Sequence, residues 1–292
     1  MLQSAHSPLN SSLPPPLPTS AGLADKLKRY VEFGRTYVTF YKTGLKNVYR
    51  NYRASLPLRK QLGLPIYLPV SPPRTISHQN PKKERQESNL GRGQFQLVRR
   101  SARDVRRMIP FTMILIVCGE FTPLIIPIFG SAITPATCRV PSQVEKERVG
   151  SVKRKLAALE SGRLPLKPDS SEQLRLLAKQ FADLAWTASA DPASVLRACA
   201  VFGLVKRHDK TASALLAGLI YRPRLTRYVE YLAIDDRMIR AGGISSMSAT
   251  EVRIAVEERG GVDISGTSDR KQAEKLERRW LEQWIALKKT VQ

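Results

Sequence analysis

One apolar stretch, Met108–Ile133, constrains this chain more than any other feature. It reads MIPFTMILIVCGEFTPLIIPIFGSAI, and about 20 apolar residues suffice to cross the hydrocarbon core of a bilayer. Glu120 lies near its centre, and Pro110, Pro123 and Pro127 interrupt it. We predict one proline-kinked transmembrane helix. A re-entrant hairpin is the alternative, because the prolines divide the stretch into short halves.

Glu120 is the sharpest functional candidate in this stretch. A charged side chain at the centre of a bilayer costs about 3 kcal/mol or much more. Glu120 could be a protonatable or cation-binding group on a path between oligomerised spans, with carbonyls freed near Pro123 and Pro127 as further ligands. Alternatively, a protonated Glu120 bonds a neighbouring helix, or a re-entrant segment brings it to the interface.

The charge of the chain limits the classes of protein to which it can belong. The 292 residues carry a formal net charge of +23, which is typical of chains that bind nucleic acid or an anionic membrane, or that carry a mitochondrial address. The first 100 residues hold 17 Lys and Arg but four acids, which gives +13 (17 − 4). Such an acid-poor, basic start is typical of a mitochondrial transit peptide. A disordered basic tail is the alternative, because the first 25 residues contain no Lys or Arg and Pro14–Pro16 would break a helix.

Composition and apolar periodicity divide the chain into five parts. Leu27, Tyr30, Phe33 and Tyr37 recur at helical spacing and predict a basic amphipathic helix over 23–53. The five parts are a transit peptide and basic region (1–53), a disordered linker (54–93), a basic lead-in and transmembrane segment (94–138), a charged helical connector (139–168) and a helical domain (169–292).

Local signals predict the helices of the last part. Apolar spacing predicts helices over Glu172–Trp186 and Arg224–Arg240, the second with its stop signal at Gly242–Gly243, and Asp191–Pro192 starts another. Ser248 and Glu251 form a capping box, and Ser268–Lys289 closes the chain with Trp280 and Trp284 on its inner face. No strand-like alternation of any length occurs. We therefore predict an all-α fold, with an orthogonal helical bundle after the membrane segment.

Several of these residues resemble the Letm family of mitochondrial inner-membrane proteins. The resemblance rests on Arg103–Phe111, Glu120–Leu124, the helix Arg224–Arg240 and the segment Ser246–Gly260. It implies a 14-3-3-like ribosome-binding domain in the mitochondrial matrix, attached to the inner membrane by a single span. Within about 20 residues of the span, six Lys and Arg precede it and four follow it, which favours, weakly, the opposite orientation.

The resemblance implies that the matrix domain binds the mitochondrial ribosome and supports the biogenesis of inner-membrane proteins. The alternative is a proton-coupled K⁺ or Ca²⁺ exchanger that uses Glu120 in an oligomeric membrane segment. A third hypothesis is a tethered assembly factor with a protein partner. We expect contacts with inner-membrane lipids and a possible homo-oligomer. The chain lacks an EF-hand loop, which argues against calcium sensing.

Basic residues in and near Arg224–Arg240 are the candidates for contact with ribosomal RNA. They are Lys206, Arg207, Arg222, Arg224, Arg227, Arg237 and Arg240. The alternative is local pairing, of Asp236 with Arg240 and of Arg227 with Glu230. Asp235 and Asp236 could form a helix cap or a structural polar pair.

The sequence gives no sign of an enzyme. It has no GxSxG, GxxxxGK[ST] or HExxH motif, and its three cysteines are scattered without a metal-binding pattern. We expect no catalytic residue, no cofactor and no metal site.

Overall fold

The computed structural model describes residues 23–66, 91–119, 134–135, 138–139, 141–161, 170–205, 216–262 and 269–289. These residues form nine α-helices and no strand, which confirms the predicted all-α class. They fall into two compact units: the N-terminal unit, up to Glu147, and the C-terminal unit, from Arg148.

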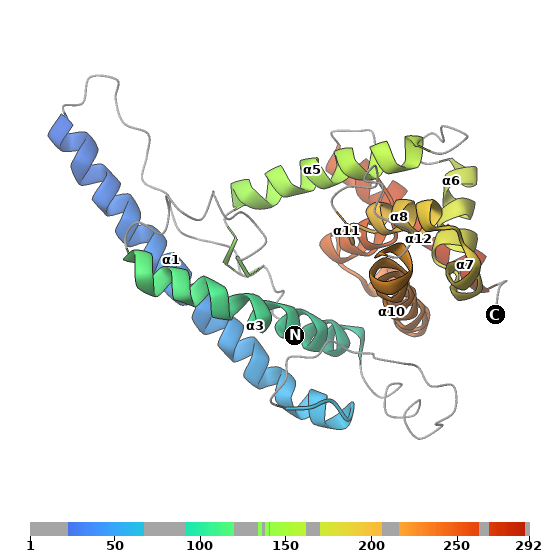
Figure 1. Ribbon diagram of the computed structural model, residues 1–292, viewed down its shortest axis with the longest axis horizontal. Helices are drawn as coiled ribbons and strands as arrows, with labels where there is room; N and C mark the ends of the chain where they lie inside the picture. The colour runs from blue at the N-terminus through green and yellow to red at the C-terminus, as the bar shows by residue number, and fades with distance from the viewer. Residues whose placement is uncertain are drawn as a thin grey trace. The chain divides into compact units, whose positions relative to one another are not determined.

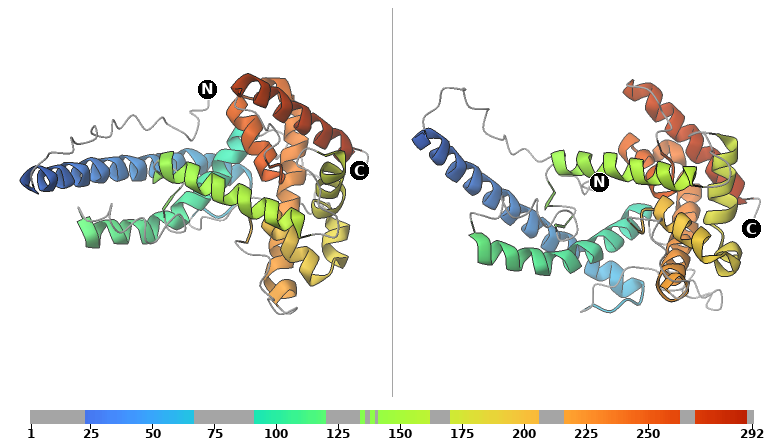
Figure 2. Two further views of the ribbon diagram at one scale, coloured as in Figure 1. Left: turned by 90° about the horizontal axis from the view of Figure 1, so that it is seen from above. Right: turned by 45° about the horizontal axis from the view of Figure 1, so that its top comes forward.

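Two crossing helices make the N-terminal unit, α1 (Leu23–Gln61) and α3 (Arg92–Cys118) (Figures 1 and 2). Tyr41, Val48, Phe111 and Cys138 form their shared core. The rings of Tyr41 and Phe111 meet edge to face with centroids 5.2 Å apart, which is a geometry that aromatic pairs prefer. Cys138 packs directly on Gly44, where an added Cβ would lie 2.6 Å from the sulfur. A glycine is therefore required at this contact.

The first helix is longer than predicted. α1 runs to Gln61, and α3 begins at Arg92, so both ends of the expected linker 54–93 are helical. The reason lies in contacts near the end of α1. Ser55 and Arg59 are buried, and the Arg59 guanidinium donates to the carbonyl of Pro65 at 2.8 Å. A cation at the end of a helix stabilises its last turn, and no apolar periodicity reveals this contact.

The described residues include the first part of the apolar stretch Met108–Ile133. α3 continues through Pro110 to Cys118, and Gly119 follows with φ +49°. Residues 120–133, with Glu120, Pro123 and Pro127, lie outside the described residues. Among the helices that are described, none is both long and apolar enough to span a bilayer.

In the C-terminal unit, the shorter helices gather around α10 (Arg222–Gly242) (Figures 1 and 2). The C-terminal unit also contains the part of α5 (Pro141–Glu160) that follows Glu147. Its remaining elements are α6 (Ser171–Leu176), η4 (Leu177–Phe181), α7 (Leu184–Ser189), α8 (Pro192–Val201), η5 (Ala217–Tyr221), η6 (Ile244–Ser246), α11 (Ala249–Glu258) and α12 (Arg270–Lys289). α10 packs on α7, α8 and η5, whereas α12 packs on α11 and η4. Trp280 and Trp284 of α12 are buried, which confirms their predicted place in the core.

The predicted helix Glu172–Trp186 is broken in the structure. α6 passes into the π-helical η4, and a new helix, α7, begins after Asp183. The carboxylate of Asp183 accepts a hydrogen bond from the backbone N–H of Trp186 at 2.7 Å. Asp183 is therefore an N-cap, and this local bond outweighs the apolar periodicity that suggested one helix.

Other predicted helix ends are confirmed. Asp191 caps α8 through the N–H of Ser194, and Ser248 and Glu251 form the capping box of α11. Gly243 ends α10 with φ +76°. Gly260, after α11, has φ +86°, and a Cβ there would lie 2.9 Å from a methyl group of Val201. The turn therefore needs glycine both for its backbone angle and for space.

Candidate functional site

The candidate RNA-binding residues separate into different environments. Lys206 and Arg207 lie outside the described residues. Arg224 and Arg227 are exposed on the first turns of α10, whereas Arg222, Arg237 and Arg240 are half-buried. Of the five candidates that the structure describes, two are therefore exposed and three are half-buried.

Arg222 has an internal role. Its guanidinium donates to the carbonyls of Thr187 at 2.6 Å and Ala190 at 2.7 Å, and also to that of Ala188. These are the last carbonyls of α7 and the residue after it, and helix-end carbonyls lack partners within the helix. Arg222 thus ties the start of α10 to the end of α7.

Other basic side chains of the C-terminal unit do the same. Arg197 donates to the carbonyls of Ala158 and Leu159 at the end of α5, both at 2.8 Å. Lys288 donates to Ala182 at 2.8 Å, just after η4, and Lys155 donates to Glu257 near the end of α11. A cation at a helix C-terminus is favoured by the helix dipole. Part of the positive charge is therefore engaged with helix-end carbonyls inside the fold and is not available to a polyanion.

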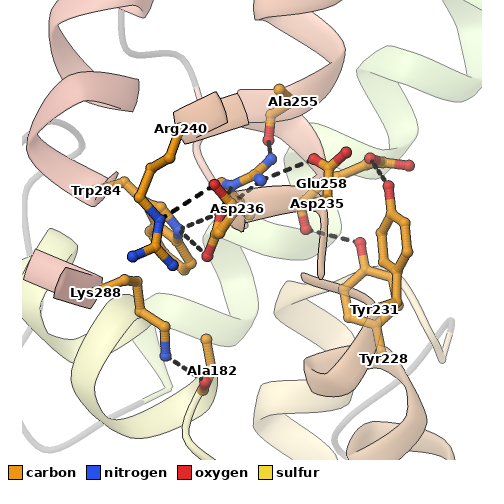
Figure 3. Close-up of polar contacts among 11 residues, drawn as sticks. Ala182, Tyr228, Tyr231, Asp235, Asp236, Arg240, Ala255, Glu258, Trp284 and Lys288 are labelled. Carbon is orange, nitrogen blue, oxygen red and sulfur yellow. Dashed lines mark hydrogen bonds and ion pairs between the residues drawn. The ribbon is translucent and has the colours of Figure 1, made fainter. Parts of the chain in front are cut away.

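A buried ion cluster joins α10 to α11 and α12. We call it the Arg259 cluster, and it consists of Arg259, Asp235, Asp236 and Trp284. Arg259 donates to Asp235 at 2.8 Å and to Asp236 at 2.6 Å, and the side chains of all three are almost wholly buried. The indole N–H of Trp284 bonds the carboxylate of Asp236 at 3.1 Å (Figure 3). This confirms that Asp235 and Asp236 are a structural polar pair.

Electrostatics hold the Arg259 cluster together. Burial alone would lower the pKa of Arg259, but Asp236 and Asp235 outweigh it and raise the pKa. Arg240 also faces this cluster, with its Nε 3.4 Å from the carbonyl oxygen of Asp236 (Figure 3). One contact of Arg240 with Asp236 is therefore made through the backbone carbonyl, while the Asp236 carboxylate binds Arg259 and Trp284.

Two tyrosines extend the polar contacts between α10 and the end of α11. Tyr231 donates to the Glu258 carboxylate at 2.6 Å, and Tyr228 donates to the Glu258 carbonyl at 2.7 Å (Figure 3). Glu230, on the same helix, is half-buried, and desolvation raises its pKa while Arg227 opposes the rise. Acids and tyrosines of α10 thus serve helix packing.

Sequence reasoning missed a row of exposed cations on α12. Lys271, Lys275 and Arg279 are exposed and recur every fourth residue, so they lie on one side of the helix. Trp280, Leu281 and Trp284 are buried on the other side. The four-residue spacing of these cations in the sequence was the available signal. We call these three residues the α12 row.

The N-terminal unit carries the other notable surface, on α3. Ile109, Met113, Ile116 and Val117 are 61–80% exposed, and their spacing of four, three and one residues places them on one side of the helix. Arg103 and Arg106, one to two turns earlier, are also exposed. We call the four apolar residues the α3 apolar face. Large apolar side chains exposed together mark a binding surface for a membrane or a protein.

The predicted ion pathway is not tested by these contacts. Glu120, Pro123 and Pro127 lie outside the described residues, so their role stays a prediction. Within the part of the chain that is described, no group of three or more His, Cys, Asp or Glu side chains could hold a metal ion.

The resemblance to the Letm family is wrong as an identification, because a model of a different family matches the chain. The helix Arg224–Arg240 suggested Letm through Tyr231, Asp235 and Asp236, which bind Glu258 and Arg259 inside the bundle. Helix-packing residues of this kind do not distinguish one helical family from another.

No curated protein and no solved structure matches the chain. The family model that does match describes the pentamidine resistance factor domain, and it matches residues 25–244. This range includes α1 from residue 25, α3 and the C-terminal unit through α10. Because the match covers more than half of the sequence, the chain belongs to the pentamidine resistance factor domain family.

Proposed function

We propose that this protein is a membrane-attached adaptor of the mitochondrial inner membrane. Its N-terminal unit attaches to the bilayer, and its C-terminal unit binds the mitochondrial ribosome in the matrix, which supports the biogenesis of inner-membrane proteins. The α3 apolar face is the observation that carries the proposal.

The α3 apolar face supports attachment in three ways. Its side chains are exposed, so the fold of the N-terminal unit does not account for them. The sequence directly after α3 stays apolar through Ile133. Arg103 and Arg106 precede the face, and each arginine near an anionic bilayer surface contributes about 1 kcal/mol. An apolar surface preceded by arginines suits the boundary between lipid headgroups and acyl chains.

The exposed cations of the C-terminal unit support ribosome binding. Those that carry this part of the proposal are the three residues of the α12 row. Successive residues of the α12 row are about 6 Å apart along the helix axis, since each residue rises about 1.5 Å. A straight row of cations suits the phosphates of an RNA backbone, whose recognition is largely independent of sequence.

The family name suggests a phenotype for the same adaptor. It ties members of the family to resistance to pentamidine. We propose that a change in drug sensitivity follows indirectly, from altered biogenesis of inner-membrane proteins. Cells that lack the protein should then show an altered sensitivity to pentamidine. A variant that has lost ribosome binding should fail to restore the normal sensitivity.

Ribosome sedimentation over a salt series tests the proposal. Mitochondrial membranes are solubilised in detergent, and the full chain is compared with the variant K271Q/K275Q/R279Q. We expect salt-sensitive co-sedimentation of the full chain. If all three residues contact phosphates, the variant should lose about 2 to 3 units of slope in log affinity against log salt.

The matched control removes three exposed cations elsewhere in the C-terminal unit, as K153Q/R154Q/R175Q. We expect this control to keep more of the salt slope than the α12 variant. Absence of co-sedimentation at low salt would refute ribosome binding. Binding that does not respond to salt would point instead to a protein partner.

A further inference from the structure

The residues just before α10 expose large apolar side chains in the C-terminal unit. Leu216, Leu219 and Ile220 are 42%, 76% and 51% exposed. They lie in and next to η5, whose first residue, Ala217, is buried and whose last residue, Tyr221, is half-buried. We call these three side chains the η5 apolar tip.

The η5 apolar tip is held in a fixed place by the fold. Ala217 is 1% exposed, and η5 packs on α8 and α10. The Cys199 thiol lies 3.6 Å from the carbonyl of Tyr221, and Arg222 directly after it binds the end of α7. The exposure of Leu219 and Ile220 therefore belongs to an anchored segment. π-Helical turns such as η5 are rare and are frequent at functional sites.

Two arginines continue this surface along α10. Arg224 lies four residues after Ile220, and Arg227 three residues further, so both are on the side of the helix that leads from the tip. Both are exposed. The sequence from Leu216 to Arg227 contains no acid, so the tip and the arginines form one apolar and cationic surface.

The combination of exposed aliphatic side chains and arginines favours one of two anionic partners, an anionic bilayer over RNA. RNA phosphates would attract Arg224 and Arg227, but an RNA backbone gives no favourable contact to exposed Leu219 and Ile220. RNA bases stack on aromatic rings, and Tyr221 is half-buried. In an anionic bilayer, aliphatic side chains enter the acyl boundary while arginines reach the headgroup phosphates.

We propose that the η5 apolar tip, with Arg224 and Arg227, docks the C-terminal unit on an anionic lipid membrane. The inference rests on the proposed function and deepens it, because it divides the exposed cations between two anions. Arg224 and Arg227 bind lipid headgroups, and the α12 row remains for RNA. The C-terminal unit then has a membrane contact of its own.

A fluorescent probe at Leu219 tests the docking in the full chain. Cys138 and Cys199 are buried, so the variant C118S/L219C presents one accessible thiol for the environment-sensitive dye NBD. The chain is reconstituted into vesicles of phosphatidylcholine alone or of phosphatidylcholine with phosphatidylglycerol. We expect a blue shift and a gain in emission in the anionic vesicles, and quenching by nitroxides on the acyl chains.

Two variants control this experiment. The dye at C118S/A286C, on an exposed position of α12, should not respond to lipid composition. Adding R224Q/R227Q to C118S/L219C should weaken the apparent affinity for anionic lipid roughly 30-fold, because each arginine near such a surface contributes about 1 kcal/mol and about 1.4 kcal/mol is a factor of ten. Circular dichroism shows whether each variant remains folded.

Each outcome decides between the possible partners. An identical NBD signal in neutral and anionic vesicles overturns the proposal. A response at position 219 to added duplex RNA, without a response to lipid, assigns the surface to RNA instead. Ribosome sedimentation of R224Q/R227Q reports separately on the adaptor function, and the proposal expects little loss there. Failure of docking and failure of ribosome binding are therefore distinguishable.

Discussion

The two ends of α10 place charged and apolar side chains in opposite ways. Near its C-terminal end, Asp235 and Asp236 are buried against Arg259. At its beginning, Arg224, Arg227 and the preceding Leu219 are exposed. Buried charges without partners are unfavourable, so the first arrangement demands complete pairing. Buried aspartates and an exposed leucine both depart from the usual pattern, in which charges are exposed and apolar side chains are buried. The comparison shows that such a departure serves helix packing at one end of α10 and suits binding at the other.

The largest effect in this comparison is expected at Arg259. Arg259→Met keeps much of the side-chain length but leaves Asp235 and Asp236 buried without their cation. Removing one partner of a buried ion pair typically costs about 3–5 kcal/mol of unfolding free energy. Urea denaturation followed by circular dichroism measures the loss. A change below about 1 kcal/mol would mean that the Arg259 cluster is not as dry as the structure indicates.

The next effect separates two neighbours, Arg222 and Arg224. Arg222→Ala removes the hydrogen bonds to the end of α7, and charged hydrogen bonds contribute about 1.5–3 kcal/mol. We expect a loss of about 2 kcal/mol, because Arg222 is half-buried. Arg224→Ala is the matched control and should stay within about 0.5 kcal/mol, as exposed substitutions do. Equal losses in the two variants would contradict the separation into structural and accessible arginines.

The smallest effect concerns pH and Lys155. Burial lowers the pKa of Lys155 from 10.5 to about 8, although Glu257 and Glu258 oppose the shift. Between these values the unfolded chain binds more protons than the folded one, so stability rises with pH, by at most about 1.4 kcal/mol per pH unit. Well below pH 8 both the folded and the unfolded chain bind this proton, so the group contributes no slope.

The variant Lys155→Met is the control for this pH dependence. Unfolding free energies at pH 7, 8 and 9 are compared for the two chains. The chain with Lys155 should gain stability between pH 8 and 9 relative to the variant. Parallel pH profiles would show that the amine of Lys155 keeps its ordinary pKa in the fold.

Much of the fold could be predicted because its signals are local. The caps at Asp191 and Ser248 and the stop at Gly243 lie within a few residues of the helix ends that they set. The Arg259 cluster could not be predicted, because Arg259 is 23 and 24 residues from its two acids in sequence and meets them only through helix packing.

The candidate site was harder to predict than the fold. Arg222 and Arg224 are the same residue type two positions apart, so the sequence does not separate them. In the structure Arg222 donates hydrogen bonds to the end of α7, whereas Arg224 is exposed. Leu216 and Leu219 have the spacing of a buried helical stripe, yet η5 leaves both exposed. The α12 row was visible as a repeat of cations, but its exposure depends on which side of α12 packs on α11.

The position of the tryptophans has an optical consequence. The chain has three, and Trp186, Trp280 and Trp284 all belong to the C-terminal unit. The rings of Trp280 and Trp284 stack with centroids 5.6 Å apart, and Trp284 bonds Asp236 in the interior. Emission excited selectively in indole therefore reports on the C-terminal unit alone, and water that reaches the Arg259 cluster should shift it to the red. The N-terminal unit contributes no indole signal, so tryptophan emission follows the opening of the C-terminal unit separately from that of the N-terminal unit.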